Sequence, residues 1–535
     1  TTQFYNYMRR EGSLLYGYKK TEISTLKGLL DVFAADIKAK GVVVWDENVP
    51  ATANVATTVC GVEDWLPVRY DPRPGSFYKL ITETYKAPVR LDLTGKFTGK
   101  GTIWQTSRAS SGSAKCDAYL WALEKYMARC SDAHLGYAVD AFTWGKDPAN
   151  PTYSGIYAMA LCNDDYFVMR KAFRFDLSPW KDELPNDDKS QPLGTDYKTF
   201  CEILQRQYQK TNGAKITQVI GFTPWEVKYT AETGGRHDAV ATEWEHAELM
   251  SAYNCVMDAD APGICSLFNA SVYSKYPLKN TYKNNRPAST PAYKPNKKYL
   301  LIYMGDFDSS AWLTTQFKNE WIDETRGSIP LAWPFNPNMA ERVPVVFDWY
   351  RSTATANDYF VAGDSGAGYL NPTLLIAGRR QHSTLPDGLE AWKNFCTPWY
   401  KKFDLTITGF ILNGANRFVG PELEVYKSFS PDGIVGLYSG MRGEAKMIGG
   451  QMPYIDMMGY GGSDNGKGSQ NYEWGMKTMR GVFNDKSIKT NFYVARYVLC
   501  SPGYVKKMTD ELKKEFDLEV VDPYSFFALL KQSLT

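Results

Sequence analysis

Residues 363–372 read Gly-Asp-Ser-Gly-Ala-Gly-Tyr-Leu-Asn-Pro, after the short apolar run 359–362 and before a segment with helical spacing. The glycines let the backbone turn through positive φ and approach another group closely, and Pro372 suits the first turn of a helix. The stretch therefore predicts a strand-to-helix turn. Such a turn lies at the carboxyl end of a strand, where α/β folds bind ligands, although a plain capped loop is the alternative.

From residue 215 onward, apolar strand candidates alternate with segments of helical spacing. The candidate strands are 216–222, 264–272, 299–304, 329–333, 359–362, 405–412, 433–437, 446–449, 492–498 and 518–521. We therefore predict an α/β fold in which residues 215–535 form a (β/α) barrel-like, TIM-type domain with an extra or irregular strand. A doubly wound open sheet is the alternative, because periodicity does not distinguish a closed sheet from an open one.

Residues 1–214 predict a separate N-terminal α/β domain. Its expected elements are a buried strand at 42–45, a helix near 114–129, a strand near 134–142, a β-rich stretch near 153–175, and a helix containing Phe200, Leu204 and Tyr208. The domain boundary is placed near residue 214, where regular alternation begins. Beyond it, Thr242 and Glu245 fit a capping box at the start of a helix, which predicts a structural role for Glu245.

Composition excludes several classes of partner. Charged residues make up 22% of the chain and the net charge is +2, so no electrostatic footprint for nucleic acid or an anionic membrane is present. No run of about 18 apolar residues occurs, which predicts that nothing spans a bilayer. The aromatic content of 14% is more distinctive, because amphipathic rings can stack on the apolar faces of sugars. A carbohydrate is therefore the expected partner; the oligomeric state is open.

The nine cysteines are scattered, with no Cys-x-x-Cys pair, which argues against a structural zinc site and against a fold built on disulfides. We expect most of them to be buried as small apolar side chains. No cofactor is predicted. The chain begins Thr-Thr-Gln, which suggests that a leader was removed before residue 1.

Three aspartates are the predicted catalytic residues: Asp306 and Asp308, which follow the strand at 299–304, and Asp364, which follows the strand at 359–362. Hydrolysis of a glycosidic bond needs two carboxyl groups, and neighbouring strand ends can hold them at a suitable separation. Two alternatives are open. These acids could only bind loop amides, or the Asp-x-Asp oxygens could hold Ca²⁺ or Mg²⁺.

Other polar and aromatic side chains are predicted to contact the substrate. They are Trp333, Tyr369, Asn371, Asn413, Gln451, Glu243 and His237. Tyr369 and Trp333 would serve as sugar platforms, and Asn371 could instead cap the following helix. A structural role is the alternative for Glu243, in a first helical turn, and a surface loop for His237. The four histidines show no three- or four-residue pairing, so no metal site is assigned.

Residues 366–372 resemble the signature of the GxGYxYP family, matching its Gly, Gly, Tyr and Pro with Asn371 in place of the second Tyr. Further stretches that are similar to the family are 44–46, 51–58, 221–225 and 305–308. The last departs most, because Phe307 and Ser309 stand where family members carry Gly and Asn. Any shared contact at Ser309 is therefore not carried over.

The resemblance, to a family of putative glycoside hydrolases, implies an N-terminal α/β domain and a barrel-like C-terminal domain. Together with the predicted carboxyl groups, it leads us to expect glycoside hydrolysis in a cleft at the carboxyl ends of the barrel strands. It also implies association with exported polysaccharide-processing proteins of Bacteroides-type bacteria. Two other functions fit the residues: a non-catalytic carbohydrate-binding protein, and a metal-dependent hydrolase or deacetylase. Distances among Asp306, Asp308, Asp364 and Glu243 would distinguish them, since glycosidase carboxyl groups lie about 5–9.5 Å apart.

Overall fold

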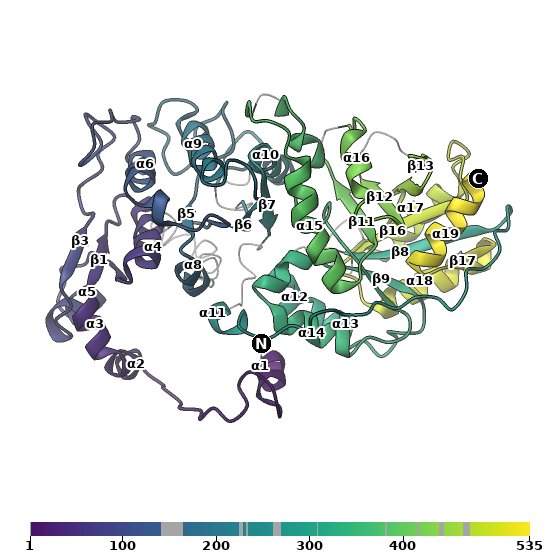
Figure 1. The fold of residues 1–535 in the computed structure, drawn as a ribbon, viewed down its shortest axis with the longest axis horizontal. Helices are drawn as coiled ribbons and strands as arrows, with labels where there is room; N and C mark the ends of the chain where they lie inside the picture. The colour runs from purple at the N-terminus through teal and green to yellow at the C-terminus, as the bar shows by residue number, and fades with distance from the viewer. Residues whose placement is uncertain are drawn as a thin grey trace.

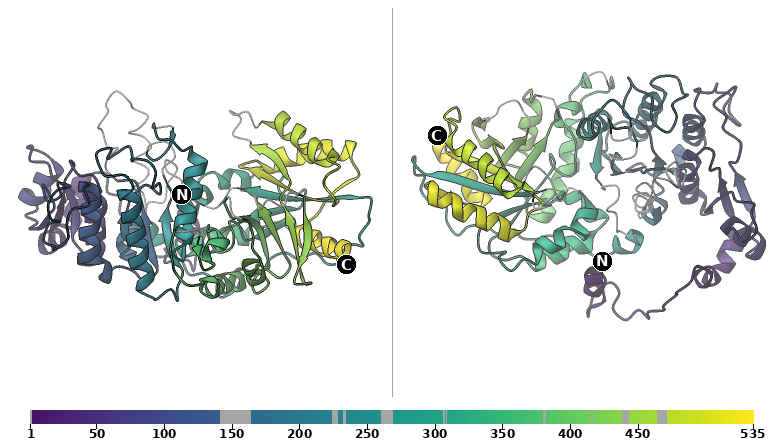
Figure 2. Two further views of the ribbon diagram at one scale, coloured as in Figure 1. Left: turned by 90° about the horizontal axis from the view of Figure 1, so that it is seen from above. Right: turned by 180° about the vertical axis from the view of Figure 1, so that it is seen from behind.

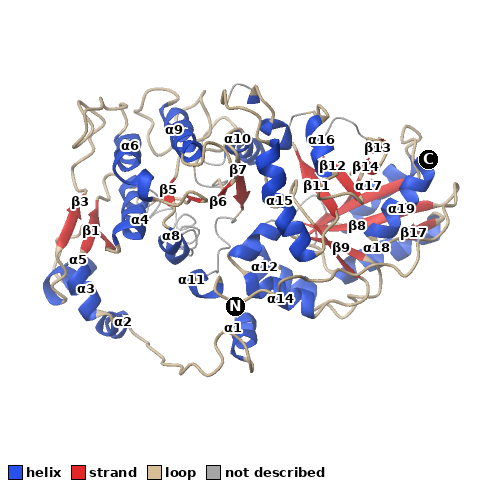
Figure 3. Cartoon of the chain, in the orientation of Figure 1, coloured by secondary structure: helices blue, strands red, loops and turns tan. Residues whose placement is uncertain are grey.

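The structure is a computed structural model that describes the chain apart from residues 1, 141–163, 224–227, 232–233, 260–268, 306, 308, 380–381, 415–416, 438–442 and 464–470. Sheets of three and four strands form the N-terminal half, and sheets of six and four strands form the C-terminal half beside it (Figure 1). Helices cover the faces of the sheets (Figure 3). The fold is therefore α/β, as predicted.

The N-terminal sheet is parallel, with the strand order β2-β1-β3. The elements of this region are α1 Thr2–Arg9, α2 Leu26–Val32, α3 Ala34–Lys40, β1 Val42–Trp45, α4 Ala51–Glu63, β2 Leu66–Arg69, α5 Phe77–Lys79, the π-helix η1 Leu80–Thr84 and β3 Val89–Asp92. All four residues of β1 are buried, as expected of an apolar run flanked by a strand on each side.

The second sheet is also parallel, with the order β5-β4-β6-β7. The elements are α6 Ala114–Tyr126, the 3₁₀ helix η2 Met127–Arg129, β4 His134–Tyr137, α8 Asp164–Arg170, β5 Phe173–Phe175, α9 Thr195–Gln209, β6 Thr217–Gly221, α10 Ala239–Ser251, β7 Cys255–Asp258 and α11 Ala270–Tyr273. Because β4 pairs with β6, one sheet contains strands from both sides of residue 214. The sheets of the C-terminal half begin only after β7.

The C-terminal half contains two sheets. Its elements are β8 Lys298–Gly305, α12 Ser310–Thr314, α13 Phe317–Trp321, β9 Leu331–Pro334, η5 Pro337–Glu341, α14 Pro344–Ser352, β10 Asp358–Val361, η6 Pro372–Leu375, α15 Leu389–Phe403, β11 Ile407–Leu412, α16 Pro421–Tyr426, β12 Gly433–Leu437, β13 Ala445–Ile448, β14 Met452–Asp456, β15 Gly459–Ser463, α17 Tyr472–Asn484, β16 Phe492–Val498, α18 Pro502–Glu515, β17 Leu518–Val520 and α19 Pro523–Leu534. One sheet has the order β10-β9-β8-β16-β15 with β17 also on β8, and the other has the order β11-β12-β14-β13.

These two sheets contact each other without forming one continuous ladder. Ala362 and Thr408 form an isolated parallel bridge beyond the end of β10. After β14, the amide of Met457 donates to the carbonyl of Gly436 at 2.8 Å and that of Met458 to the carbonyl of Val494 at 3.2 Å. The described residues therefore show no single closed sheet, and the predicted barrel is not confirmed.

Several local predictions differ from the structure. The helix α10 begins four residues earlier than the predicted capping box, because Asp238 is its N-cap and accepts from the amide of Ala241 at 2.8 Å. Thr242 therefore lies inside the helix. The strand that follows α10 in the structure is β7, which ends before residue 264. The predicted strand 264–272 falls mostly on residues that are not described. The described end of the predicted β-rich stretch contains helix α8 before the short strand β5.

An aromatic cluster fills the core between β9 and the helices α13 and α14. The ring of Phe317 lies within 5.5 Å, centroid to centroid, of Trp321, Trp333 and Tyr350. Trp333 is fully buried, and its indole nitrogen donates to Asp358 at 2.8 Å. Both faces of this ring are thus enclosed by protein, which leaves no face for a sugar.

The first helix of the chain packs on the C-terminal half. Phe4 stacks edge-on against Trp349, and the Tyr7 hydroxyl donates to Asp348 at 2.9 Å. The chain then runs back to α2 beside the N-terminal sheet (Figure 2). The segment from α1 to α2 therefore connects the two halves.

Seven cysteines lie among the described residues; all are free thiols and six are buried, as expected of small apolar side chains. In the part of the chain that the structure describes, no helix has the length and hydropathy needed to cross a membrane.

Glu341 of η5 joins the C-terminal half to the second sheet. Its carboxylate lies 3.0 Å from His134 Nε2 and 2.8 Å from Arg170 Nη2, and it accepts a hydrogen bond from Gln218. Burial raises the pKa of this carboxyl group. The hydrogen bond and charge of His134, with the charge of Arg170, outweigh burial and hold that pKa below its usual value.

We expect Glu341→Gln to lower the free energy of unfolding by about 1–3 kcal/mol at pH 7, since charged hydrogen bonds are lost. A carboxyl group with a lowered folded-state pKa stabilises the protein above its unfolded pKa of about 4.3, and this contribution disappears as the pH falls through the folded value. Urea unfolding at pH 7 and at pH 3.5 checks this. A difference between variant and parent that grows toward acid would contradict it.

Candidate functional site

The glycine-rich turn at 363–372 has the conformation that its sequence predicted. Asp364 and Ser365 both have positive φ, at 36° and 75°, followed by Gly366 at 150° and Gly368 at 107°. The Ser365 amide donates to the Phe410 carbonyl at 2.7 Å, and its hydroxyl donates to the Leu412 carbonyl at 2.9 Å. The turn is thus fixed to β11. Pro372 begins the 3₁₀ helix η6, with Asn371 at the N-cap position.

The second part of this turn contacts the N-terminal half. Tyr369 exchanges two backbone hydrogen bonds with Met257 of β7, at 2.8 and 3.0 Å, and both residues are buried. The backbone amide of Asn371 donates to the hydroxyl of Ser251, at the end of α10, at 2.9 Å. The turn therefore brings the C-terminal half against α10 and β7.

The side-chain amide of Asn371 and the carboxylate of Glu248 both lie beside Gly414 at this contact. A Cβ atom added at Gly414 would lie 2.7 Å from Glu248 Oε1 and 3.0 Å from Asn371 Nδ2. Asn371 is fully buried, and neither polar atom of its side chain has a hydrogen-bond partner within the described part of the chain. Gly414, at φ 57°, thus leaves room for both side chains where a larger residue would not fit.

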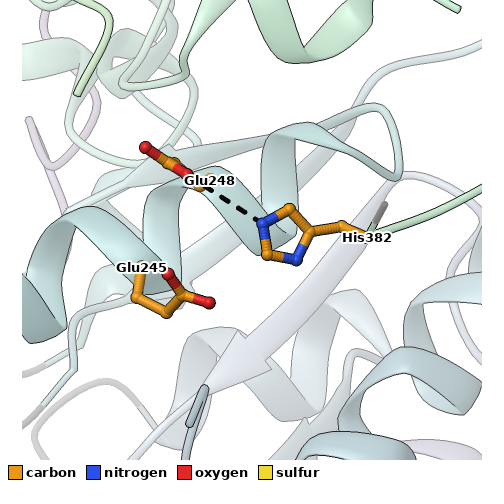
Figure 4. Close-up of side chains that lie close together, drawn as sticks. All are labelled: Glu245, Glu248 and His382. Atoms are coloured by element: carbon orange, nitrogen blue, oxygen red, sulfur yellow. Dashed lines mark ion pairs between the residues drawn. The ribbon is translucent and has the colours of Figure 1, made fainter. Parts of the chain in front are cut away.

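Glu245, Glu248 and His382 converge at this position (Figure 4). One ligand atom from each lies within 4.8 Å of the other two. The two glutamates are three residues apart on α10 and so share one face of the helix. His382 Nε2 lies 3.9 Å from Glu248 Oε2, with 8% of each side chain exposed. The other ring nitrogen, Nδ1, lies 3.2 Å from the Tyr197 hydroxyl.

Chemically, this group offers two carboxyl groups in different surroundings. Glu248 is buried beside the imidazole, and Glu245 is half-buried. Such a pair can supply an acid and a nucleophile or base, and the same three side chains have the donor types that bind divalent metal ions.

Comparison with known proteins places the chain in a family. The "GxGYxYP putative glycoside hydrolase C-terminal domain" matches residues 296–531, and the "GxGYxYP_N second domain" matches residues 39–130. The chain belongs to the GxGYxYP family. This confirms the resemblance seen at residues 366–372.

A solved structure shares the fold of this GxGYxYP protein. A crystal structure of a "putative hydrolase" from Bacteroides thetaiotaomicron VPI-5482 matches with a TM-score of 0.68 at 16% identity, over 100% of this chain and 87% of that chain. A "putative polysaccharide deacetylase" from Mycobacterium smegmatis matches with a TM-score of 0.30 at 12% identity, over 47% of this chain and 96% of its own; that likeness supports no argument. No curated protein matches the chain significantly.

The structure brings part of the predicted site together. Asp364 is buried and accepts from Asn336 Nδ2 at 2.9 Å. Asn413 lies next to Gly414, and its side chain holds Thr373 of η6 through hydrogen bonds of 2.7 and 3.2 Å. Tyr369 and Asn371 lie in the same turn. Asp306 and Asp308 fall outside the described residues.

The remaining predicted residues lie elsewhere in the GxGYxYP protein. Trp333 is in the core described above, and Gln451 is exposed in the turn between β13 and β14. His237 precedes α10, stacks on Trp180 at 3.5 Å and lies 3.1 Å from Asp182. Glu243 is half-buried on α10, two positions from Glu245 and so on a different face of the helix.

Sequence reasoning missed Glu245, Glu248 and His382. A capping box gave Glu245 a structural role, and the isolated His382 showed no pairing in the sequence. The signal that could have identified the pair is the spacing of three between Glu245 and Glu248 within a helix. His382 could not have been found this way, because it joins them only through the tertiary fold.

We expect Gly368→Ala to lower the free energy of unfolding by about 2–4 kcal/mol, because a Cβ would lie 2.4 Å from Val256 Cγ2 and 3.0 Å from the Met257 carbonyl. Gly420→Ala is the control, since its φ of 117° is similar and no atom lies within 4 Å of an added Cβ. The control should lose only about 1–2 kcal/mol. Equal losses in thermal or urea unfolding would show that backbone strain, and not contact with β7, explains the glycine.

Proposed function

We propose that this GxGYxYP protein is a glycoside hydrolase whose two catalytic carboxyl groups are Glu245 and Glu248. The family match and the hydrolase-like fold of the Bacteroides structure support the general class. The observation that carries the residue assignment is the convergence of Glu245, Glu248 and His382 beside the family's signature turn.

The separation of the two carboxyl groups favours a retaining reaction. Oxygens within 4.8 Å of each other are closer to the separation of about 5–5.5 Å in retaining enzymes than to the 6.5–9.5 Å of inverting ones. Glu248, beside His382, would attack the anomeric carbon as the carboxylate. Glu245 would protonate the departing glycosidic oxygen, and would then remove a proton from the water that releases the sugar.

Three aspartates at the strand ends are the alternative location for the same reaction. Asp364 lies after β10, and Asp306 and Asp308 follow β8, so a cleft at the carboxyl ends of these strands, in a barrel-like arrangement, would hold substrate there. The buried hydrogen bond of Asp364 to Asn336 would orient its carboxylate.

A panel of oligosaccharides and polysaccharides, assayed for sugar release, tests the proposal. The parent should release sugar, Glu245→Gln and Glu248→Gln should not, and Asp306→Asn, Asp308→Asn and Asp364→Asn should retain activity. If only the aspartate variants lose sugar release, catalysis would be assigned to the aspartates at the strand ends. Calorimetric binding of a glycan without release would instead assign a non-catalytic carbohydrate-binding protein.

The same three side chains favour one other function, a metal-dependent hydrolase or deacetylase. Two carboxylates and one imidazole within 4.8 Å form a possible divalent-cation site. Metal analysis of the purified protein and assay after chelation decide between the two. Full activity after chelation, in protein free of metal, would exclude the metal-dependent function.

We also propose that the protein is exported, on the basis of the family resemblance to polysaccharide-processing proteins. Fractionation of the source cells, with detection in periplasmic or surface fractions, tests this.

A further inference from the structure

A pocket of about 280 Å³ lies between the first and second sheets, away from Glu245 and Glu248. Its lining residues are Trp45, Ala53, Asn54, Thr57, Pro67, Arg69, Phe77, Val139, Asp140, Asp164 and Arg174. Trp45 and Arg69 end β1 and β2, and Val139 and Asp140 follow β4. The pocket therefore lies at the carboxyl ends of parallel strands, where open α/β sheets bind ligands.

Arg174 of β5 is the buried cation of this pocket, with its side chain only 1% exposed. Nη1 is hydrogen-bonded to Asp164 and lies 3.3 Å from Thr57 Oγ1. The other edge of the guanidinium, formed by Nε and Nη2, is buried and has no hydrogen-bond partner among the residues described. Unsatisfied charged donors are costly to bury, and this edge has the geometry that binds a carboxylate through two parallel hydrogen bonds.

The surrounding polar groups are held in place by the fold. Asn54 Nδ2 donates to the Ala138 carbonyl at 2.8 Å and to the Tyr119 hydroxyl at 3.1 Å. The Asp140 carboxylate lies 2.9 Å from Lys228 Nζ. These partners orient an amide and a carboxylate beside the pocket, where they can exchange hydrogen bonds with hydroxyl groups.

The remaining walls include the aromatic side chains Trp45 and Phe77, which can pack on the apolar face of a sugar ring. The volume lies just below the range of about 300–1,000 Å³ typical of sites for drug-sized ligands, so the pocket suits one monosaccharide and not a longer chain.

We propose that this pocket binds a monosaccharide that carries a carboxylate, with the acid group on the Nε–Nη2 edge of Arg174. The polar residues Asn54 and Asp140 contact the hydroxyl groups, and Trp45 packs on the ring. This site is separate from the proposed hydrolytic residues, and binding there requires no turnover.

Isothermal titration calorimetry with glucuronate, galacturonate, glucose and inorganic phosphate tests the site. We expect a uronate to bind the parent, glucose not to bind, and phosphate to bind more weakly than the uronate. Arg174→Lys keeps the charge but removes the two-nitrogen edge, so affinity should fall at least about tenfold. Arg108→Lys is the matched control, because Arg108 also pairs with a carboxylate, that of Glu202, but does not line the pocket; it should change affinity less than about threefold.

Ala53→Phe provides a second measurement that leaves Arg174 unchanged. It fills the pocket from α4 and should abolish uronate binding, whereas Glu248→Gln should bind uronate like the parent. The proposal is overturned if no uronate binds at millimolar concentration, if glucose or phosphate binds as tightly, or if Ala53→Phe binds like the parent. Because Glu248→Gln is included, failure of the hydrolase proposal would leave this result unaffected.

Discussion

Glu248→Gln is expected to lower kcat on the best glycan substrate by about 10²–10⁴-fold, with a much smaller change in KM. Glutamine has nearly the same shape but can neither attack the anomeric carbon as a carboxylate nor exchange a proton. The loss should therefore appear in the chemical step and not in substrate binding. Initial rates across a range of substrate concentrations, with circular dichroism to confirm folding, measure this.

Glu422→Gln is a suitable matched control. Glu422 is also a fully buried glutamate beside the signature turn, since its carboxylate lies 3.2 Å from Thr373 Oγ1 and accepts from the amides of Val419 and Gly420. It lies outside the Glu245–Glu248–His382 group. The control should lose stability but keep kcat within about threefold, because only structural hydrogen bonds change.

In a retaining reaction, a second substitution at Glu248 can show whether this residue is the nucleophile. If Glu248 is the nucleophile, a small external anion such as azide should restore part of the activity of a Glu248→Ala variant and yield a glycosyl azide of inverted configuration. NMR of the first product of the parent should show the anomer of the substrate. Equal loss of kcat in the Glu422 and Glu248 variants would instead indicate that both act through stability.

The sequence predicted most of the strands because their apolar runs are buried on both faces. Every strand expected from residue 299 onward is present. β14 and β15 were missed, since Pro453 interrupts one and glycines make up much of the other, and both residue types are unfavourable in strands. The way the sheets join depends on long-range contacts such as Ala362 with Thr408, which local patterns do not encode.

The candidate site could be predicted only in part for a related reason. The turn at 363–372 is local, so the positive φ values of Gly366 and Gly368 and the helix start at Pro372 followed from residue type, whereas the positive φ values of Asp364 and Ser365 did not. Its contact with α10 and β7 depends on residues more than 100 positions away, such as Ser251 and Met257. Trp333 illustrates the opposite error, because residue type does not show whether an aromatic ring faces a cleft or the core.

Lys228→Met is expected to lower the free energy of unfolding by about 3–5 kcal/mol, a change comparable with the whole stability of a small domain. Lys228 is completely buried, and its Nζ lies 2.9 Å from Asp140, 2.7 Å from Asp176 and 2.8 Å from Asp187. Burial alone would lower the pKa of this amine, but the three carboxylates raise it well above its usual value. Methionine fills a similar volume yet leaves those carboxylates without this cation.

The neighbouring lysine, Lys115, can compensate for only part of this loss. It contacts Asp187 at 2.8 Å and Asp196 at 2.7 Å, but no contact with Asp140 or Asp176 is found within the described residues. Those two aspartates follow β4 and β5, so we expect the second sheet to loosen first, with earlier amide exchange there.

Lys215→Met is the control, because Lys215 makes a single exposed ion pair with Asp132 at 2.7 Å and should lose less than about 1 kcal/mol. Thermal and urea unfolding of both variants measure the difference. If Lys228→Met unfolds like Lys215→Met, the buried aspartates must take up protons at little cost when the lysine is removed. That outcome would mean that the lysine contributes little net stability, and that apolar packing around β4 and β5 holds the second sheet together.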